Sequence, residues 1–152
     1  MAAHGRQKFF SGGRIAGTAR WFESIGMKPG RFHAITAAST EVTSGLLLAA
    51  GFMTPLAAAA FVGLMFVAAW TVHRPNGFFS VNSGWELNFI FAITAICLAG
   101  IGPGRLSLDH ILNIDDTLSG WLGLAIAAGI GLSAGVGLLA FFYRPPAPQT
   151  TD

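Results

Sequence analysis

The fold is decided by residues 34–72, AITAASTEVTSGLLLAAGFMTPLAAAAFVGLMFVAAWTV, which run for 39 residues with a single charge, Glu41. As one helix this segment would be about 59 Å long at about 1.5 Å per residue, roughly twice the hydrocarbon thickness of a bilayer. Gly51 and Pro55 interrupt it, and both residues disfavour a helix interior. The segment therefore predicts two membrane-spanning helices, at about residues 32–52 and 55–72.

Two further apolar segments follow. The third, at about residues 85–102, ends at the Gly-Pro-Gly of residues 102–104, and the fourth, at residues 119–143, is closed by the Arg-Pro-Pro of residues 144–146. We predict an all-α integral membrane bundle with four transmembrane helices over residues 32–143. A basic segment at residues 1–31 would precede it, with an amphipathic interfacial helix at about residues 14–27, and a short polar tail at residues 144–152 would follow it.

The composition supports a membrane location. Of the 152 residues, 53% are apolar and 11% are charged, whereas about 25% of a typical soluble domain is charged. Sixteen charges are too few to cover a soluble surface. The single cysteine, Cys97, excludes an intramolecular disulfide and a dithiol redox cycle. The basic N-terminal residues are not followed by the apolar core of a secretory signal peptide.

The distribution of basic residues predicts the orientation. Six Lys and Arg residues lie within residues 1–31, and Arg74 and Arg144 would lie on the same side of the membrane, whereas only Arg105 would lie on the other. The positive-inside rule therefore predicts a multi-pass protein of the bacterial plasma membrane with both termini in the cytoplasm. Anionic lipid headgroups account for the basic segment, so we expect membrane lipids and no nucleic acid as partners.

The fourth segment carries two rows of small residues at helical spacing, which let helix backbones approach closely in lipid. They predict contacts with two neighbours, either within the chain or in another subunit. The first row is Ser119, Gly123, Ala127, Gly131 and Gly135; the second is Ala125, Gly129, Ser133 and Gly137.

Two carboxylates are candidates for chemistry, as a proton relay or a quinone contact. Glu41 lies midway along the first predicted span, where a charged carboxylate costs about 2.5–3.5 kcal/mol on insertion scales. Glu86 opens the third span. Each has a structural alternative: Glu41 as a hydrogen-bond partner of a neighbouring helix, and Glu86 as a favourable charge at a helix N-terminus. The four histidines are scattered, so we predict no metal site, and no phosphate loop or catalytic triad is present.

Several phrases in this order resemble the DoxX family of small bacterial membrane proteins. They are His4-Gly5-x-x-Lys8-x-Phe10, Trp21-Phe22-Glu23-x-x-Gly26, Glu41 with Gly51-x-x-Thr54-Pro55, Val72-His73-x-x-Asn76-Gly77-Phe78-Phe79, Gly84-Trp85-Glu86 and Gly102-Pro103-Gly104-Arg105-x-Ser107-x-Asp109. The resemblance covers about residues 1–110 and implies a membrane four-helix bundle linked to quinone-dependent redox proteins. Besides the two carboxylates, it places six residues near the membrane faces as ligand-binding candidates: His4, Lys8, His73, Asn76, Arg105 and Asp109.

The chain departs from the family in two respects. Family members have a transmembrane helix that leads into the His-Gly-x-x-Lys motif, whereas this sequence starts at that motif. The fourth span, at residues 119–143, lies beyond the family core. We therefore expect a form that lacks the family's first helix, or a start further upstream, with the extra C-terminal helix filling the vacant place.

Two functions are compatible with these features. The first is a subunit of a quinone- or thiol-linked redox system, an oxidoreductase component with quinone as its candidate cofactor and with redox subunits or further copies as partners. The alternative is a non-enzymatic assembly or transport-accessory protein, whose glycine faces bind partner helices.

Overall fold

The computed structural model describes residues 1–11 and 13–146; most of the predicted polar tail therefore lies outside the described residues. Within the described part, the chain is helical, and its one β contact is an isolated antiparallel bridge between Met27 and Tyr143. The prediction of an all-α protein is confirmed.

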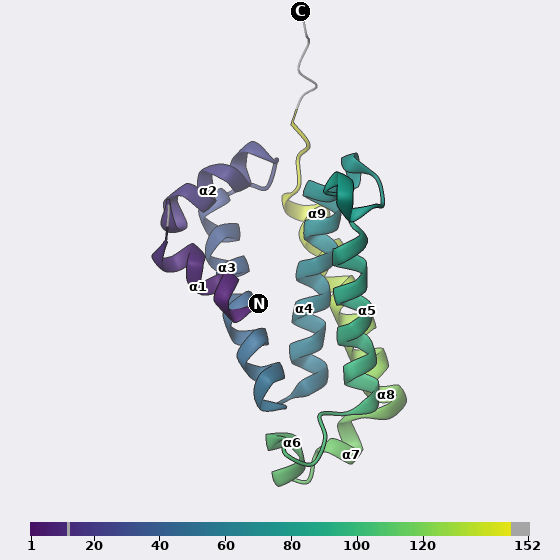
Figure 1. The fold of residues 1–152 in the computed structure, drawn as a ribbon. Coiled ribbons are helices and arrows are strands. Elements are labelled where there is room, and N and C mark those ends of the chain that lie inside the picture. The colour runs from purple at the N-terminus through teal and green to yellow at the C-terminus, as the bar shows by residue number, and fades with distance from the viewer. Residues whose placement is uncertain (12, 147–152) are drawn as a thin grey trace, which may run out of the picture.

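Four long helical segments form an antiparallel bundle (Figure 1). All four predicted apolar segments are helical. Their bounds are α3, Gly30–Ala50; α4, Thr54–Ala68, continued by a π-helical turn η1, Ala69–His73, and a 3-10 turn η2, Arg74–Asn76; α5, Glu86–Ile101; and α8, Gly120–Ala125, continued by the π-helical η4, Ile126–Ile130, and by α9, Gly131–Phe142.

The four segments differ in length and apolar character. The helices over Thr54–Asn76 and Gly120–Phe142, with 23 residues each, are long and apolar enough to cross a membrane. The helix α5 is apolar but has 16 residues, and α3 has 21 residues that include histidine, threonine, serine and glutamate. The structure therefore provides two candidate spans by length and composition, of the four that the sequence predicts.

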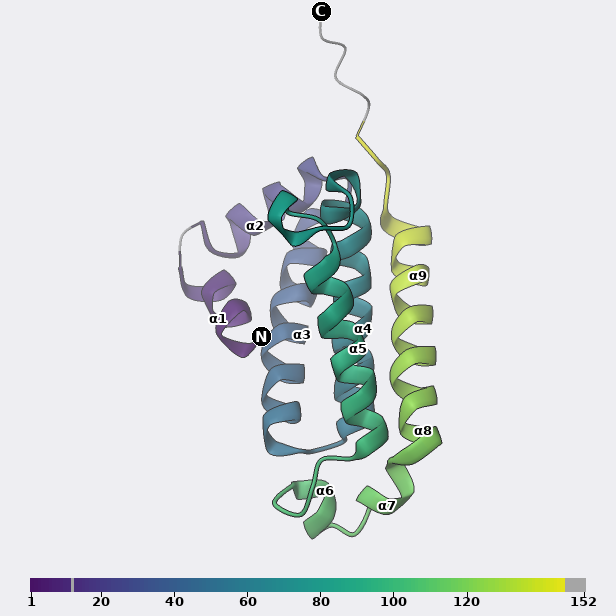
Figure 2. The ribbon, with the colours of Figure 1, turned by 45° about the vertical axis from the view of Figure 1, so that its right-hand side comes forward.

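The N-terminal segment forms two helices, α1 (Ala2–Phe10) and α2 (Arg14–Ser24). The predicted interfacial helix corresponds to α2, whereas α1 was not predicted from the sequence. Both pack against α3 on the side away from α5 (Figures 1 and 2). The helix α1 approaches α3 closely because Gly5 lies directly against the backbone of Ala38 and because Gly45 lies against Ala2. Tertiary packing stabilises this short helix, which has little intrinsic stability alone.

The central helix is α4, which contacts α3, α5 and α9. Its Ala58, Val62 and Met65 are buried in the core with Ala99 and Ala127. Small residues bring α9 close to it: a side chain at Gly131 or Gly135 would collide with α4. The first row of small residues thus packs within the chain, whereas Gly129 and Gly137 of the second row have open space beside them.

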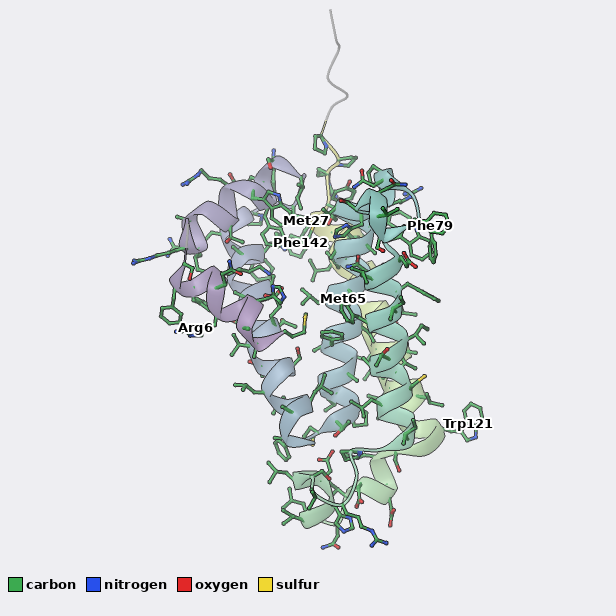
Figure 3. All side chains as sticks on the ribbon, in the orientation of Figure 1. Arg6, Met27, Met65, Phe79, Trp121 and Phe142 are labelled. Atoms are coloured by element: carbon green, nitrogen blue, oxygen red, sulfur yellow. The ribbon has the colours of Figure 1, made fainter. Side chains whose placement is uncertain are left out.

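The bundle has two ends. The Trp85 end comprises the start of α3, the loop 77–85 with the 3-10 turn η3 (Ser80–Asn82), and the end of α9; the Asp109 end comprises the α3–α4 turn and the short helices α6 (Leu108–Ile111) and α7 (Asp115–Leu118). Figure 3 shows Phe79 and Trp121 projecting outward at the Trp85 end and the Asp109 end, respectively. Their side chains are 63% and 87% exposed, which suits aromatic residues at the two interfaces of a membrane.

Candidate functional site

The clearest charged feature in the bundle is an ion pair between Lys8 of α1 and Glu41 of α3. The two residues are 33 positions apart, and the close contact of α1 with α3 brings them together. The Glu41 side chain is 9% exposed and the Lys8 side chain 28%. Of the two carboxylate oxygens, Oε1 binds the ammonium group, whereas Oε2 is buried and has no hydrogen-bond partner among the described residues.

The Lys8–Glu41 pair leaves one carboxylate oxygen able to bind a proton or a ligand. Removing two charges from water costs several kcal/mol per ion, which mutual attraction offsets only with good geometry and further hydrogen bonds. Because Oε2 lacks such a bond, Glu41 retains an unused acceptor inside the bundle, or a donor when it is protonated. The pair can therefore hold a proton or bind a polar group of a membrane-soluble ligand.

The structure does not connect Glu41 with Glu86. At the Trp85 end, the Glu86 carboxylate accepts a hydrogen bond from the Ser80 backbone N–H at 2.8 Å. His73 Nδ1 lies 2.7 Å from the Ser83 carbonyl oxygen, and Asn76 donates to the same oxygen at 3.2 Å. Glu86, His73 and Asn76 therefore gather at one loop and hold its backbone, apart from the ion pair in the middle of α3.

Asp109 lies at the opposite end, and its side chain is fully buried. Its carboxylate accepts hydrogen bonds from the backbone N–H groups of Met53 and Thr54 at 2.7 and 3.0 Å and from the Thr54 hydroxyl at 2.7 Å. These donors form the first turn of α4, where unpaired N–H groups favour an anion. Asp109 thus caps α4 from 55 residues away, and this contact accounts for its burial without a ligand.

The remaining ligand-binding candidates, His4 and Arg105, are exposed. His4 lies one helical turn before Lys8 on α1, and Arg105 lies in the loop that follows α5. Within residues 1–11 and 13–146, no three His, Cys, Asp or Glu residues are grouped so that they could hold a metal ion.

A second ion pair lies at the Asp109 end. His110 Nδ1 is 2.7 Å from Asp115 Oδ2, and this side-chain hydrogen bond lowers the pKa of Asp115 below its ordinary value. The His110 side chain is 47% exposed and that of Asp115 is 21% exposed, so the pair is a surface feature that orders the turn between α6 and α7.

Two polar residues that the sequence did not select lie against cavities. His33 is 3% exposed, its Nε2 has no partner in the described structure, and it borders a cavity of about 190 Å³ between α3, α4 and α9. Asn88 is 9% exposed and borders a cavity of about 470 Å³ between α4, α5 and α9. Both residues interrupt apolar segments, which is the signal that could have identified them.

The fold defines the class: a small all-helical membrane protein whose apolar helices are exposed around a narrow core of small residues. Residues 1–74, just under half of the chain, match the model of the DoxX family, and over these residues the chain is similar to that family. The resemblance found in the sequence is thereby confirmed over this segment.

One relative among the known proteins is an uncharacterized protein of Haemophilus influenzae. It is 29% identical over 86 residues, which cover 57% of this chain and 57% of the relative. The chain therefore spans little more than half of that relative's length. No solved structure matches the chain.

Proposed function

We propose that this chain is a four-span subunit of a quinone- or thiol-linked redox system in the plasma membrane. The observation that carries the proposal is the Lys8–Glu41 pair, whose carboxylate keeps a buried oxygen without a partner. A buried ionisable residue in a membrane bundle is costly, and such residues commonly serve proton or ligand pathways. Lys8 and Glu41 also lie within the segment that matches the DoxX family.

In this proposal, Glu41 would hold and release one proton at its buried carboxylate, and Lys8 would stabilise the charged carboxylate that remains. A bound quinone would take up two electrons from a partner subunit and two protons, one from Glu41 and one from water at the membrane face. The unpartnered Oε2 fits a quinone oxygen as donor when Glu41 is protonated, and a hydroquinone hydroxyl as acceptor when it is ionised.

The proposed membrane topology has the Trp85 end of the bundle, with the end of α9, in the cytoplasm. The N-terminus lies away from this end, because Ala2 contacts Gly45 in the second half of α3. The positions of four basic residues support this topology: Lys28 and Arg31 at the start of α3, Arg74 at the end of the α4 segment, and Arg144 after α9 all lie at the Trp85 end. Arg105 lies at the Asp109 end. Under the positive-inside rule, this asymmetry favours the Trp85 end as the cytoplasmic end. The shorter α5 and the more polar α3 would then complete a bundle of four spans.

The test compares Glu41→Gln with Asp116→Asn, which neutralises an exposed carboxylate in α7. Each variant is purified from native membranes in mild detergent, and its lipid extract is analysed for quinone. Partner subunits are identified by mass spectrometry, and membranes are assayed for reduction of the quinone analogue decylubiquinone. We expect Glu41→Gln to keep its abundance and helicity but to lose quinone and activity, whereas Asp116→Asn keeps both. A quinone-free oligomer without redox subunits would overturn the proposal.

One observation favours the alternative of an assembly or transport-accessory protein. Gly129 and Gly137 of the fourth segment have open space beside them, so this helix face is free to accept a partner helix. Under this alternative, Gly129→Leu would release a co-purifying partner, and Glu41→Gln would affect only the stability of the protein.

A further inference from the structure

A cavity between α4, α5 and α9 has an apolar body and a polar end. It holds about 470 Å³, which is within the usual range of about 300–1,000 Å³ for small-molecule sites. Val62, Ala92, Ile96 and Leu132 line its body; Trp70, Arg74, Trp85 and Asn88 line the part nearest the Trp85 end.

The polar end carries a positive charge. The Arg74 guanidinium lies 4.2 Å from the centre of the Trp70 ring, a cation–π contact that holds it beside the cavity mouth. The two ion pairs of the described residues join Lys8 to Glu41 and His110 to Asp115, so Arg74 has no carboxylate partner there. Glu86, which follows Trp85, does not line the cavity.

Asn88 lies one turn deeper, and its amide is nearly buried. The bond that the structure gives it is a long contact from Nδ2 to the Met65 sulfur, at 3.9 Å, and sulfur is a weak acceptor. A buried amide without a good hydrogen-bond partner is unfavourable. The amide therefore has hydrogen-bonding capacity available to a ligand that enters the cavity.

We propose that this cavity binds an anionic phospholipid, with its phosphate at Arg74 and one acyl chain along the apolar body. The charge of Arg74 selects a negative headgroup, the Asn88 amide binds an ester carbonyl, and the apolar walls exclude polar solutes. The orientation proposed above puts Arg74 at the cytoplasmic leaflet, where anionic lipids attract basic residues. The site is separate from the Lys8–Glu41 pair, so it stands independently of the redox function.

The test uses the two tryptophans of the cavity as reporters. The chain has four tryptophans, and Trp21→Phe with Trp121→Phe leaves Trp70 and Trp85. This protein is reconstituted into phosphatidylcholine vesicles that contain either brominated phosphatidylglycerol or brominated phosphatidylcholine, because bromine on the acyl chain quenches nearby indole fluorescence. We expect phosphatidylglycerol to bind about fivefold more tightly, which corresponds to about 1 kcal/mol for one basic residue.

Two substitutions assign the preference to Arg74. Arg74→Gln should abolish the preference, and Arg74→Lys should retain most of it. Arg144→Gln is the matched control, because Arg144 lies at the same end outside the cavity and should leave the preference unchanged. Ala92→Leu narrows the apolar body and should weaken quenching by both lipids.

Two results would overturn the proposal. The first is equal quenching by the two brominated lipids in the reporter protein. The second is a preference for phosphatidylglycerol that survives Arg74→Gln, because it would show that the anionic lipid binds elsewhere.

Discussion

The strongest prediction concerns the cap that Asp109 provides for α4. Asp109→Ala removes an acceptor that serves the backbone N–H groups of Met53 and Thr54 and the Thr54 hydroxyl. Loss of a helix cap costs about 0.5–2 kcal/mol, and a buried donor left without a partner costs about 1–3 kcal/mol. Since such costs are not additive, we expect a loss of about 3 kcal/mol in the free energy of unfolding.

The assay is unfolding in mixed micelles with increasing dodecyl sulfate, followed by far-ultraviolet circular dichroism. Asp109→Asn keeps one oxygen acceptor and should cost about half as much. In a Thr54→Val background, the cost of Asp109→Ala should fall by about 1 kcal/mol, because the hydroxyl that would be left unpaired is absent. The exposed Asp116→Ala is the control and should change stability by less than about 0.5 kcal/mol. An Asp109→Ala variant as stable as Asp116→Ala would refute the reasoning.

Three further predictions follow from packing and charge. Gly131→Ala should destabilise by about 1–3 kcal/mol in the same assay, because the added carbon meets α4, whereas Gly137→Ala, with open space, should be neutral or slightly stabilising. Lys8→Met should lower the free energy of unfolding by about 3 kcal/mol, because the Glu41 carboxylate would remain buried without its partner. Adding Glu41→Gln to this variant should restore most of that loss. The hydrogen bond from His110 lowers the pKa of Asp115, so His110→Ala should raise that pKa in a carbon NMR titration. Because the folded-state pKa is lowered, this contact stabilises at neutral pH, and its contribution disappears as the pH falls through the folded-state pKa.

The helix ends show what local sequence can predict. The helix α5 ends at Ile101, directly before Gly102, whose φ is +90°, as the Gly-Pro-Gly stretch predicts. The helix α3 ends at Ala50, and Gly51 follows with φ +58°. A side chain at Gly51 would also collide with Ser107 and Pro103. Glycine adopts a positive φ without steric cost, so the sequence alone predicts that these two helices end there.

The candidate site shows the opposite case. Glu41 stands out because a carboxylate is costly in an apolar segment, but nothing local identifies Lys8 as its partner. That pairing depends on α1, which the sequence did not predict as a helix, and on the close contact of Gly5 with α3. Asp109 was predicted to bind a ligand, and the structure shows it bound to the first turn of α4.

The sequence by itself determined the membrane class, the all-helical fold and the DoxX resemblance, because apolar content and helix-breaking residues act over short stretches of chain. Only the tertiary structure decided which polar groups meet. It joined Lys8 to Glu41, placed Asp109 at the start of α4 and separated Glu86 from Glu41. These contacts depend on how helices far apart in the chain pack, and in lipid that packing follows from the fit of small residues rather than from hydrophobicity.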